Sequence, residues 1–232
     1  MQEKTFSDLI AGLTTGFTPV VDAGFFVEDY VPIDLSVNNP ELQEAELTSA
    51  SEYSIFLRKF LEEKQKKVAF GGYNEKRGLY KRSALFSTPV EEDLIRNVHL
   101  GVDIWAEEGT AVLAVLDGTV HSFQDNNNFG DYGPTIILKH EFQDLSFYSL
   151  YGHLSRNSLA HFKAGQQVKA GEKIGELGGP SENGDYAPHL HFQIIRDLGT
   201  QKGDFPGVAC KRDLEKFLSN CPDPNLLLKI PS

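Results

Sequence analysis

Four of the seven histidines lie in three short segments, HLGVD at 99–103, YGHLS at 151–155 and PHLHF at 188–192. Imidazole nitrogens together with a carboxylate, and without a thiolate, are typical ligands of a borderline ion such as Zn²⁺. Three protein ligands that leave a fourth position for water are typical of catalytic zinc sites, whereas structural sites usually have four. The segments therefore indicate a zinc centre that activates water and polarises a carbonyl group.

HLGVD is predicted to be a β-strand, because β-branched residues favour an extended chain over a helix. Side chains alternate along a strand, so His99, Gly101 and Asp103 are expected to face one side. The apolar residues between them would face the core. On this interpretation Gly101 leaves space between the imidazole and the carboxylate for an ion.

The other two segments follow the same alternation. His189 and His191 would share one face of a strand, with Leu190 and its apolar neighbours on the opposite face. Tyr151 and His153 would likewise share a face. Three strands would then present polar side chains on one surface and anchor themselves through their apolar backs, which is typical of a site on a rigid sheet.

An isolated histidine on a strand is more often a hydrogen-bonded structural residue than a metal ligand, so each segment alone is weak support. The three together favour a metal site. The remaining histidines have no partners at ligand spacing. His121 and His161 are predicted to lie at the surface, and His140 is predicted to have a structural or supporting role.

The net charge of −11 disfavours nucleic acid as a partner, because binding to a phosphate backbone relies on clustered lysine and arginine. The N-terminal sequence has no basic segment followed by an apolar run, and no stretch approaches the roughly 20 apolar residues that span a bilayer. A cytoplasmic protein without membrane insertion is expected. Cys210 and Cys221 are predicted to be reduced, partly buried thiols, since a disulfide would contradict that location.

The chain is predicted to divide into an N-terminal extension at 1–66, partly helical, and a β domain at 67–232. Within the extension, Ser7 to Ile10 and Asn39 to Leu42 resemble helix starts, and residues 52–67 have the apolar spacing of an amphipathic helix. Further helix is expected near 211–218.

From residue 67 onward, short β-rich runs alternate with Gly, Asp and Asn turns. Spacing this short leaves no room for crossover helices, so a mainly β, antiparallel fold is predicted. The segment at 116–118 (LDG) is expected to form a hairpin turn between two strands.

The three histidine segments closely resemble the lysostaphin-type, or LytM-type, zinc metallopeptidases. The pattern of that family is His-x-x-x-Asp, then Tyr-x-His-Leu, then His-x-His, and it occurs here in the same order and with similar spacing over about residues 95–195. The resemblance implies an antiparallel β-sandwich with a groove, of the duplicated hybrid motif type related to lipoyl carriers. It also implies that His99, Asp103 and His191 hold Zn²⁺ and that His153 and His189 are the catalytic histidines.

The sequence departs from the family pattern in three places. Gln193 stands where glutamate is usual after His-x-His, and the segments 128–134 and 181–188 replace shorter glycine-rich loops. Those loops are expected to border the groove, where a peptide or muropeptide-like substrate would bind. The residues expected to contact the substrate are Tyr151, Asn128, Asp131, Tyr132 and Tyr186.

A second resemblance involves GGYNEKRGLY at 71–80, the loops at 131–134 and 183–193, DFPGVA and CPDPN. These segments are similar to the metallopeptidase-like part of some larger proteins that also contain aminotransferase and phosphotransferase domains. That similarity implies an intracellular role on a small or non-wall substrate.

Two other functions remain as alternatives. One is a non-catalytic metal-binding or ligand-binding module of the same fold, although all five site positions are intact. The other is phosphotransfer through a histidine, a reaction that would not need the carboxylate of Asp103.

The N-terminal extension could also narrow the groove. The segment 71–80 could pack beside the groove together with the extension. Its residues Tyr73, Asn74, Arg77 and Tyr80 are candidates to line a pocket, and simple surface packing is the alternative.

Overall fold

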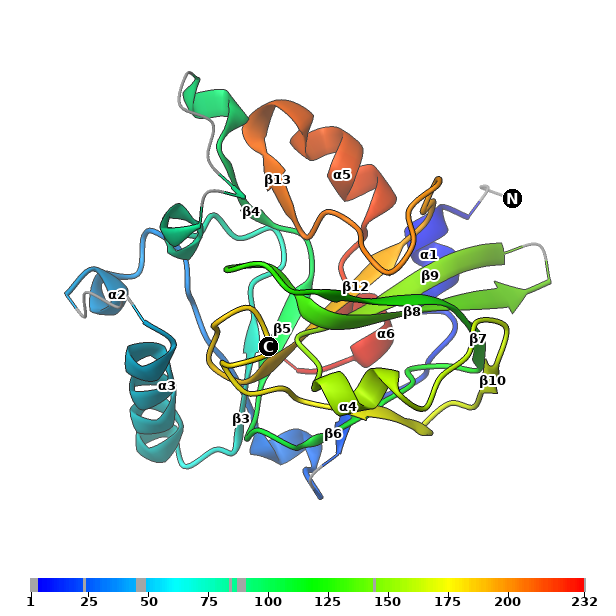
Figure 1. The fold of residues 1–232 in the computed structure, drawn as a ribbon, viewed down its shortest axis with the longest axis horizontal. Helices are drawn as coiled ribbons and strands as arrows, with labels where there is room; N and C mark the ends of the chain where they lie inside the picture. Colours follow the sequence, from blue (N-terminus) through cyan, green and yellow to red (C-terminus); the bar gives the residue numbers. More distant parts are fainter. Residues whose placement is uncertain are drawn as a thin grey trace.

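The protein is described by a computed structural model covering residues 4–22, 24–44, 49–83, 85–86, 91–143 and 145–231 (Figure 1). The predicted mainly β, antiparallel architecture with helices near the N-terminus is confirmed. The strands are β1 (Val21–Asp22), β2 (Tyr30–Pro32), β3 (Val68–Gly71), β4 (Arg96–His99), β5 (Val102–Trp105), β6 (Ala111–Leu113), β7 (Gly118–Asn126), β8 (Gly133–Phe142), β9 (Leu145–Gly152), β10 (Gln167–Val168), β11 (Lys173–Glu176), β12 (His189–Ile195) and β13 (Val208–Cys210).

The helices lie mainly in the first and last parts of the chain. They are α1 (Phe6–Ala11), α2 (Pro40–Glu44), α3 (Ala50–Lys64), α4 (Arg156–Leu159), α5 (Leu214–Asn220) and α6 (Asn225–Leu228). Short 3₁₀ turns occur at Val27–Asp29, Leu79–Arg82, Glu92–Leu94 and Lys211–Asp213. In the described part of the chain, none of these helices combines the length and apolarity needed to cross a bilayer.

The strands form one large sheet and two small ones. The large sheet has eight strands in the order β10-β7-β8-β9-β12-β5-β3-β2, of which only β2 and β3 pair in parallel. A three-stranded sheet has the order β1-β6-β11, and β4 pairs with β13. Each strand of the site therefore has a defined neighbour: β12 lies between β9 and β5, and β4 lies outside the large sheet.

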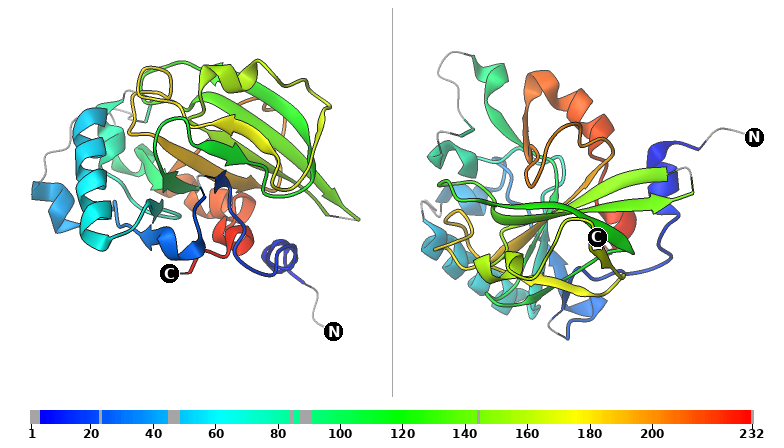
Figure 2. Two further views of the ribbon diagram at one scale, coloured as in Figure 1. Left: turned by 90° about the horizontal axis from the view of Figure 1, so that it is seen from below. Right: turned by 45° about the vertical axis from the view of Figure 1, so that its right-hand side comes forward.

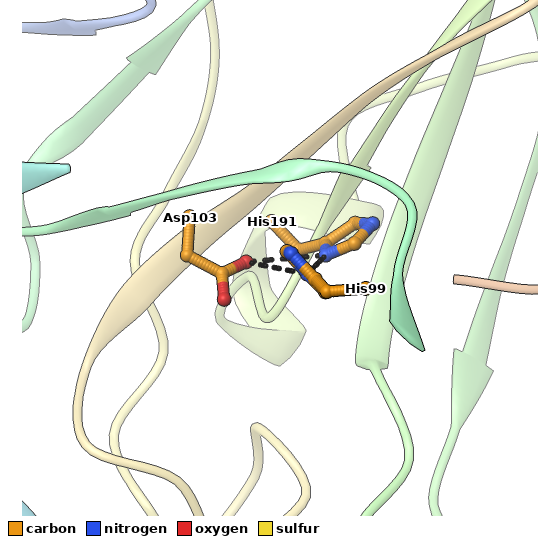
Figure 3. Close-up of side chains that lie close together, drawn as sticks. All are labelled: His99, Asp103 and His191. Atoms are coloured by element: carbon orange, nitrogen blue, oxygen red, sulfur yellow. Dashed lines mark hydrogen bonds and ion pairs between the residues drawn. The ribbon is translucent and has the colours of Figure 1, made fainter. Parts of the chain in front are cut away.

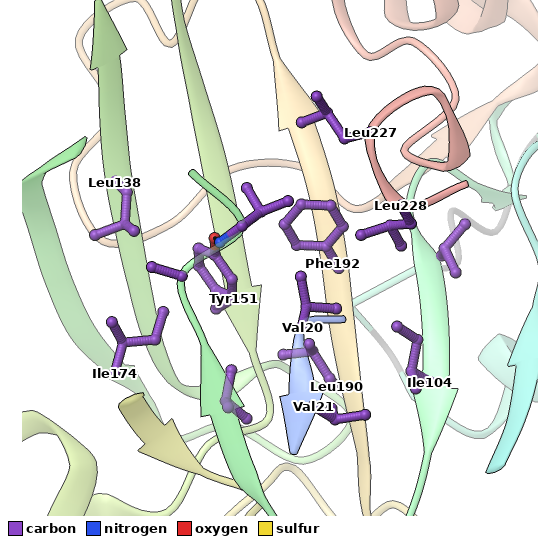
Figure 4. Packing of buried hydrophobic residues seen from close by; sticks show 14 of the residues in the cluster. Val20, Val21, Ile104, Leu138, Tyr151, Ile174, Leu190, Phe192, Leu227 and Leu228 are labelled. Atoms are coloured by element: carbon purple, nitrogen blue, oxygen red, sulfur yellow. The ribbon is translucent and has the colours of Figure 1, made fainter. Parts of the chain in front are cut away.

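The main core lies between the large sheet and the three-stranded sheet (Figure 4). Val21 of β1 packs there with Leu190 and Phe192 of β12 and Ile104 of β5, all nearly inaccessible to solvent. Because side chains alternate along β12, burying Leu190 and Phe192 in this core turns His189 and His191 to the opposite face. Core packing thus determines which residues reach the site.

Helices and loops cover the opposite face of the large sheet. Apolar residues of α5 pack on a cluster that includes Leu150, Ile195 and Phe205. Helix α3 lies beside β3 at one end of the sheet, where Leu57 packs against Ala69 and Trp105 (Figure 1). Helices α1 and α6, one near each end of the described chain, lie side by side (Figure 2).

The predicted helices are present, with α1, α2 and α3 at the three expected places and α5 near residues 211–218. The division at residue 66 stays a prediction, and residues 1–3, 23 and 45–48 of the extension lie outside the described part. Strands from both sides of this boundary pair with each other, β1 with β6 and β2 with β3. Cys210 and Cys221 are both free and buried.

Two strand predictions are wrong. The LDG segment does not join a hairpin, because β6 belongs to the three-stranded sheet and β7 to the large one. HLGVD is not one strand either: β4 ends at His99, the chain bends through Leu100 and Gly101, and β5 begins at Val102. In both cases the local residues favour extended chain, but burial of the apolar positions requires the chain to pass from one sheet to another.

Candidate metal centre

Three side chains from three strands converge on one point (Figure 3). His99 ends β4, Asp103 lies on β5, and His191 lies directly opposite Asp103 on β12. His99 Nε2 is 2.8 Å from His191 Nδ1, and Asp103 Oδ1 is 3.2 Å and 3.1 Å from these two nitrogens. All three side chains are buried, with 2% of each residue exposed. Residues distant in sequence are therefore brought into ligand spacing by strand pairing.

Hydrogen bonds on the far side of each ring determine where its proton lies. His99 Nδ1 is 2.9 Å from the carbonyl oxygen of Gly72, which can only accept, so the proton is on Nδ1. His191 Nδ1 faces the cluster, where it lies 3.1 Å from Asp103 Oδ1, and its Nε2 is 2.9 Å from Gln193 Oε1, whose amide nitrogen donates to the Pro206 carbonyl. With a cation in the cluster, the proton of His191 therefore belongs on Nε2, and the two nitrogens that face each other both offer lone pairs.

This donor set fits zinc. Donor atoms about 2.0–2.1 Å from a tetrahedral zinc ion lie roughly 3.3 Å apart, and the three atoms here are separated by nearly that distance. Two bare imidazole nitrogens and a carboxylate oxygen in contact repel one another unless a cation lies between them. Three donors from the chain would leave one coordination position for a further ligand.

Electrostatics favour the same protonation states. Burial, followed by the nearby Arg77 guanidinium, lowers the pKa of His99 to about 3. Burial by itself would raise the pKa of Asp103, but His99 and Arg77 outweigh it and hold that pKa well below the usual range. At neutral pH the imidazole is therefore neutral and the carboxylate ionised, which are the forms that bind a metal ion.

Gly101 has a different role from the one expected. We predicted that it leaves space for an ion between His99 and Asp103. In the structure the ring of His191 fills that space, and an added Cβ at position 101 would lie 2.6 Å from its Cε1 and Nε2 atoms. The glycine thus permits the approach of the third candidate ligand.

His153 and His189 lie beside this cluster with their ring centroids 4.2 Å apart. His153 follows the end of β9 in a left-handed conformation (φ 62°), which turns its ring into the site. Its Nδ1–H donates to the Asn183 carbonyl at 2.7 Å, and that of His189 to the Ala187 carbonyl at 2.8 Å. Both rings therefore have an unprotonated Nε2.

Burial also affects these two rings. Burial, and then the neighbouring His189 and His191, hold the pKa of His153 well below its ordinary value. Burial is likewise the main cause of the lowered pKa of His189. The ring of His189 is nearly parallel to that of Trp105, at 5.7 Å between centroids. Both histidines are neutral at neutral pH and can accept a proton on Nε2.

A cavity of about 250 Å³ opens beside the five residues, all of which line it. One wall comes from the extension and the segment that follows it, and its residues are mostly apolar or aromatic: Leu35, Ala50, Tyr53, Leu79, Tyr80, Leu85 and Phe86. The opposite wall includes the loops before β8 and β12. The cavity is thus enclosed on one side by chain that precedes β4.

The residues predicted to contact substrate divide into two groups. Asp131, Tyr132 and Tyr186 line the cavity, whereas Asn128 is exposed outside it and donates to Asp131. The prediction for Tyr151 is wrong. Its ring is fully buried in the main core, and its hydroxyl bonds to the Val115 amide at 3.0 Å. The expected shared face with His153 fails because the strand ends at Gly152.

Of the candidates in the segment 71–80, Arg77 and Tyr80 line the cavity. The Tyr73 hydroxyl instead donates to the carbonyl of Cys221, and Asn74 contributes a backbone bond to His99. It stays a prediction that the extension narrows the groove and so limits which substrates can bind.

The remaining histidines lie away from the cavity. His140 is buried between the Asp117 carbonyl and Ser149 Oγ, in agreement with a structural role. His161 is exposed, and His121 is half-buried with a contact to Ser122 Oγ.

Sequence reasoning missed what supports the candidate ligands. Gln193 was noted only as a departure from the family pattern, yet it orients His191. The alternation along β12 could have revealed it, since positions 189, 191 and 193 share a face. The bond from Arg77 to Asp103 had no local signal, because 26 positions separate the two residues.

Comparison with known proteins shows a similarity to peptidases over part of the chain. Residues 97–203 match the model described as Peptidase family M23. An uncharacterized metalloprotease of Haemophilus influenzae is 36% identical over 96 residues, which are 41% of this chain and 18% of the relative. The murein hydrolase activator NlpD of Escherichia coli is 35% identical over 94 residues, 40% of this chain and 22% of the relative.

Two further proteins are similar to part of the chain. The peptidoglycan DD-endopeptidase ShyC of Vibrio cholerae is 33% identical over 97 residues, 42% of this chain and 20% of the relative. The catalytic domain of the peptidase lysostaphin from Staphylococcus simulans is 29% identical, with a TM-score of 0.36, over 52% of this chain and 80% of that domain. The chain thus spans about a fifth of the length of the three sequence relatives, and its residues 97–203 are similar to Peptidase family M23.

Proposed function

We propose that this chain is a zinc-dependent peptidase that hydrolyses an amide bond in a peptidoglycan-derived or other short peptide. The observation that carries the proposal is the convergence of two imidazole nitrogens and a carboxylate oxygen within 3.2 Å of one another, beside a cavity that two further histidines also line. Similarity to a peptidase family and to the endopeptidase relative supports the same reaction class.

His99, Asp103 and His191 would hold the ion. Bound zinc lowers the pKa of a water ligand to about 7 and polarises a carbonyl group. The tautomers of the two histidines are fixed by Gly72 and Gln193, so their lone pairs are directed to the site before any ion arrives. The chain therefore offers a preorganised set of donors.

His153 would act as the general base. Its Nδ1 proton is held by the Asn183 carbonyl, so Nε2 can accept the proton of the attacking water and then deliver it to the leaving amine. The lowered pKa keeps this nitrogen unprotonated at neutral pH. The rings of Tyr186 and His153 are in T-shaped contact, and the left-handed backbone of His153 sets the direction of its own ring.

His189 would assist from the other side. Its Nε2 is 3.8 Å from Asp103 Oδ1, and its ring is held by Trp105 and the Ala187 carbonyl. Once it takes up a proton, the imidazolium would be placed to stabilise negative charge on the substrate oxygen. The aromatic and apolar cavity wall would exclude water around that charge and so strengthen the interaction.

A second candidate function is a non-catalytic module that activates another hydrolase. The relative from Escherichia coli is described as a murein hydrolase activator, which is the observation that favours this alternative. The five intact site residues and their converging lone pairs favour catalysis instead.

The test is incubation of zinc-loaded protein with muropeptides and with short peptides rich in glycine or alanine, followed by mass spectrometry. We expect cleavage of an amide bond in at least one class and none with His153→Ala at equal zinc content. Zinc binding without any product would favour the non-catalytic module.

A further inference from the structure

Arg77 is a buried cation that forms an ion pair with Asp103, one of the candidate metal ligands. Its side chain is 2% exposed, and its Nη1 donates to Asp103 Oδ2 at 2.5 Å. It lies outside the region that matches the peptidase family, which begins at residue 97. A charged side chain buried this deeply carries a large desolvation cost unless its partners satisfy it.

Two further contacts, with Glu75 and Trp105, hold the guanidinium in place. Its Nε donates to Glu75 Oε2 at 2.5 Å, and Glu75 Oε1 in turn accepts from the Leu35 amide at 3.0 Å. The Trp105 ring lies under the guanidinium, 5.8 Å from its centroid to Cζ. Arg77 is therefore held between Glu75, which precedes β4, and Trp105 of β5, in an orientation that aims one donor at Asp103.

The two oxygens of Asp103 have separate partners as a result. Oδ1 faces His99 Nε2 and His191 Nδ1, whereas Oδ2 is held by Arg77. A free carboxylate can bind a metal ion through one oxygen or through both. A charge-assisted hydrogen bond to a guanidinium is among the stronger hydrogen bonds in proteins, so Oδ2 is withheld from the ion.

We propose that Arg77 is a positioning residue that restricts Asp103 to coordination through Oδ1 alone, which keeps the centre four-coordinate with one position for water. This inference rests on the proposed zinc function. Coordination through both oxygens would fill or crowd the position that water needs. The segment 72–77 thereby completes the metal centre, since its Gly72 carbonyl also orients His99.

Metal affinity alone does not test this role. The guanidinium repels a divalent ion, while the positioning of Asp103 favours binding, so the two effects oppose each other. Coordination geometry is the discriminating readout, because a merely structural ion pair would not change it. Cobalt(II) in place of zinc reports geometry through its visible absorption, which is strong for four-coordinate sites and weak for higher coordination.

We expect wild-type protein with one equivalent of cobalt(II) to give the intense four-coordinate spectrum. Arg77→Met should lose several-fold in absorption, because Oδ2 then turns to the ion. Arg77→Lys retains a donor for Oδ2 and should restore most of the wild-type spectrum. In the zinc form, X-ray absorption should show one more oxygen at about 2.0–2.2 Å in Arg77→Met than in wild type.

The matched control is Arg156→Gln, which removes a surface arginine that pairs with Asp125 at 2.9 Å. Its cobalt spectrum should equal that of wild type. If Arg77→Met alone does not fold, the double variant Arg77→Met/Glu75→Gln replaces it in the experiment. The second substitution removes the charge of Glu75, which would otherwise be left without its arginine partner. A wild-type spectrum in the folded Met variant overturns the role of Arg77, whereas wild-type protein that binds no cobalt or zinc overturns the proposed function.

Discussion

The ring of His191 lies where a side chain at position 101 would begin. An added Cβ on Gly101 would be 2.6 Å from His191 Nε2 and 2.8 Å from the Phe192 carbonyl oxygen. The second contact is with backbone, so the chain cannot relieve the overlap by a rotation of the histidine alone. The glycine of HLGVD is thus required by the packing of the third candidate ligand against the bend between β4 and β5.

We therefore expect Gly101→Ala to lower the free energy of unfolding by about 1–3 kcal/mol, which is typical of overpacking. Zinc affinity should fall at the same time, because His191 must move. Thermal unfolding and competition with a chelator measure the two effects. Gly16→Ala is the matched control, since no atom lies within 4 Å of an added Cβ there. Equal stability and equal zinc affinity of Gly101→Ala and Gly16→Ala would contradict this interpretation.

His153→Ala should keep zinc and lose activity. His153 is not one of the three residues whose donor atoms converge, and its Nδ1–H is bonded to the Asn183 carbonyl, so its Nε2 can take part in proton transfer. Removal of a general base typically lowers the rate about 10²–10⁴-fold. Steady-state kinetics with metal analysis of the same sample tests the prediction. Activity at the wild-type rate would show that His153 is not the base.

Gly72→Ala should reproduce the effect of losing Arg77. Its backbone has φ +98°, and an added Cβ would lie 1.8 Å from Arg77 Nη2. We expect the cobalt(II) absorption to weaken as in Arg77→Met. Gly171→Ala separates backbone strain from this contact, because that glycine has φ +76° with no atom within 4 Å. A Gly171 variant with the same spectral change would contradict the contact as the cause.

His140 should make the protein sensitive to acid. Burial lowers its pKa to about 4, from 6.5, in the folded state. Between these values the unfolded chain binds more protons, so stability is complete above pH 6.5 and falls as the pH drops toward 4. The loss approaches roughly 3 kcal/mol, from about 1.36 kcal/mol for each pH unit.

The measurement is denaturant unfolding at several pH values for wild type and His140→Gln. The variant loses the contacts to Asp117 and Ser149 and so starts from a lower stability. Its dependence on pH between 6.5 and 4 should nevertheless be shallower than that of wild type. Identical slopes would mean that His140 takes up its proton equally in both states.

Much of the site was predictable because β12 is a regular strand. Alternation correctly placed His189 and His191 on one face and Leu190 on the other. The motif order then allowed His99, Asp103 and His153 to be proposed with them. The helices of the extension were predicted from helix-start residues and apolar spacing. In α3 the helix begins at Ala50, two residues before the predicted segment, where Ser49 and Glu52 form reciprocal capping bonds.

Alternation failed wherever the chain left a strand. His99 and Asp103 belong to different sheets, and His153 reaches the site through a left-handed residue, so Tyr151 faces the core. The contacts of Arg77 also lay beyond local reasoning. They depend on the pairing of residues 72–77 with β4, which no spacing within either segment encodes.

The most direct test of the proposed function is the zinc content of purified protein after exposure to excess zinc and removal of loosely bound metal. The proposal predicts one equivalent in wild type and a loss of at least about tenfold in affinity in Asp103→Ala, as expected when a ligand is removed. Wild-type protein that retains no zinc, or a variant that binds it equally well, would contradict a metal centre at His99, Asp103 and His191.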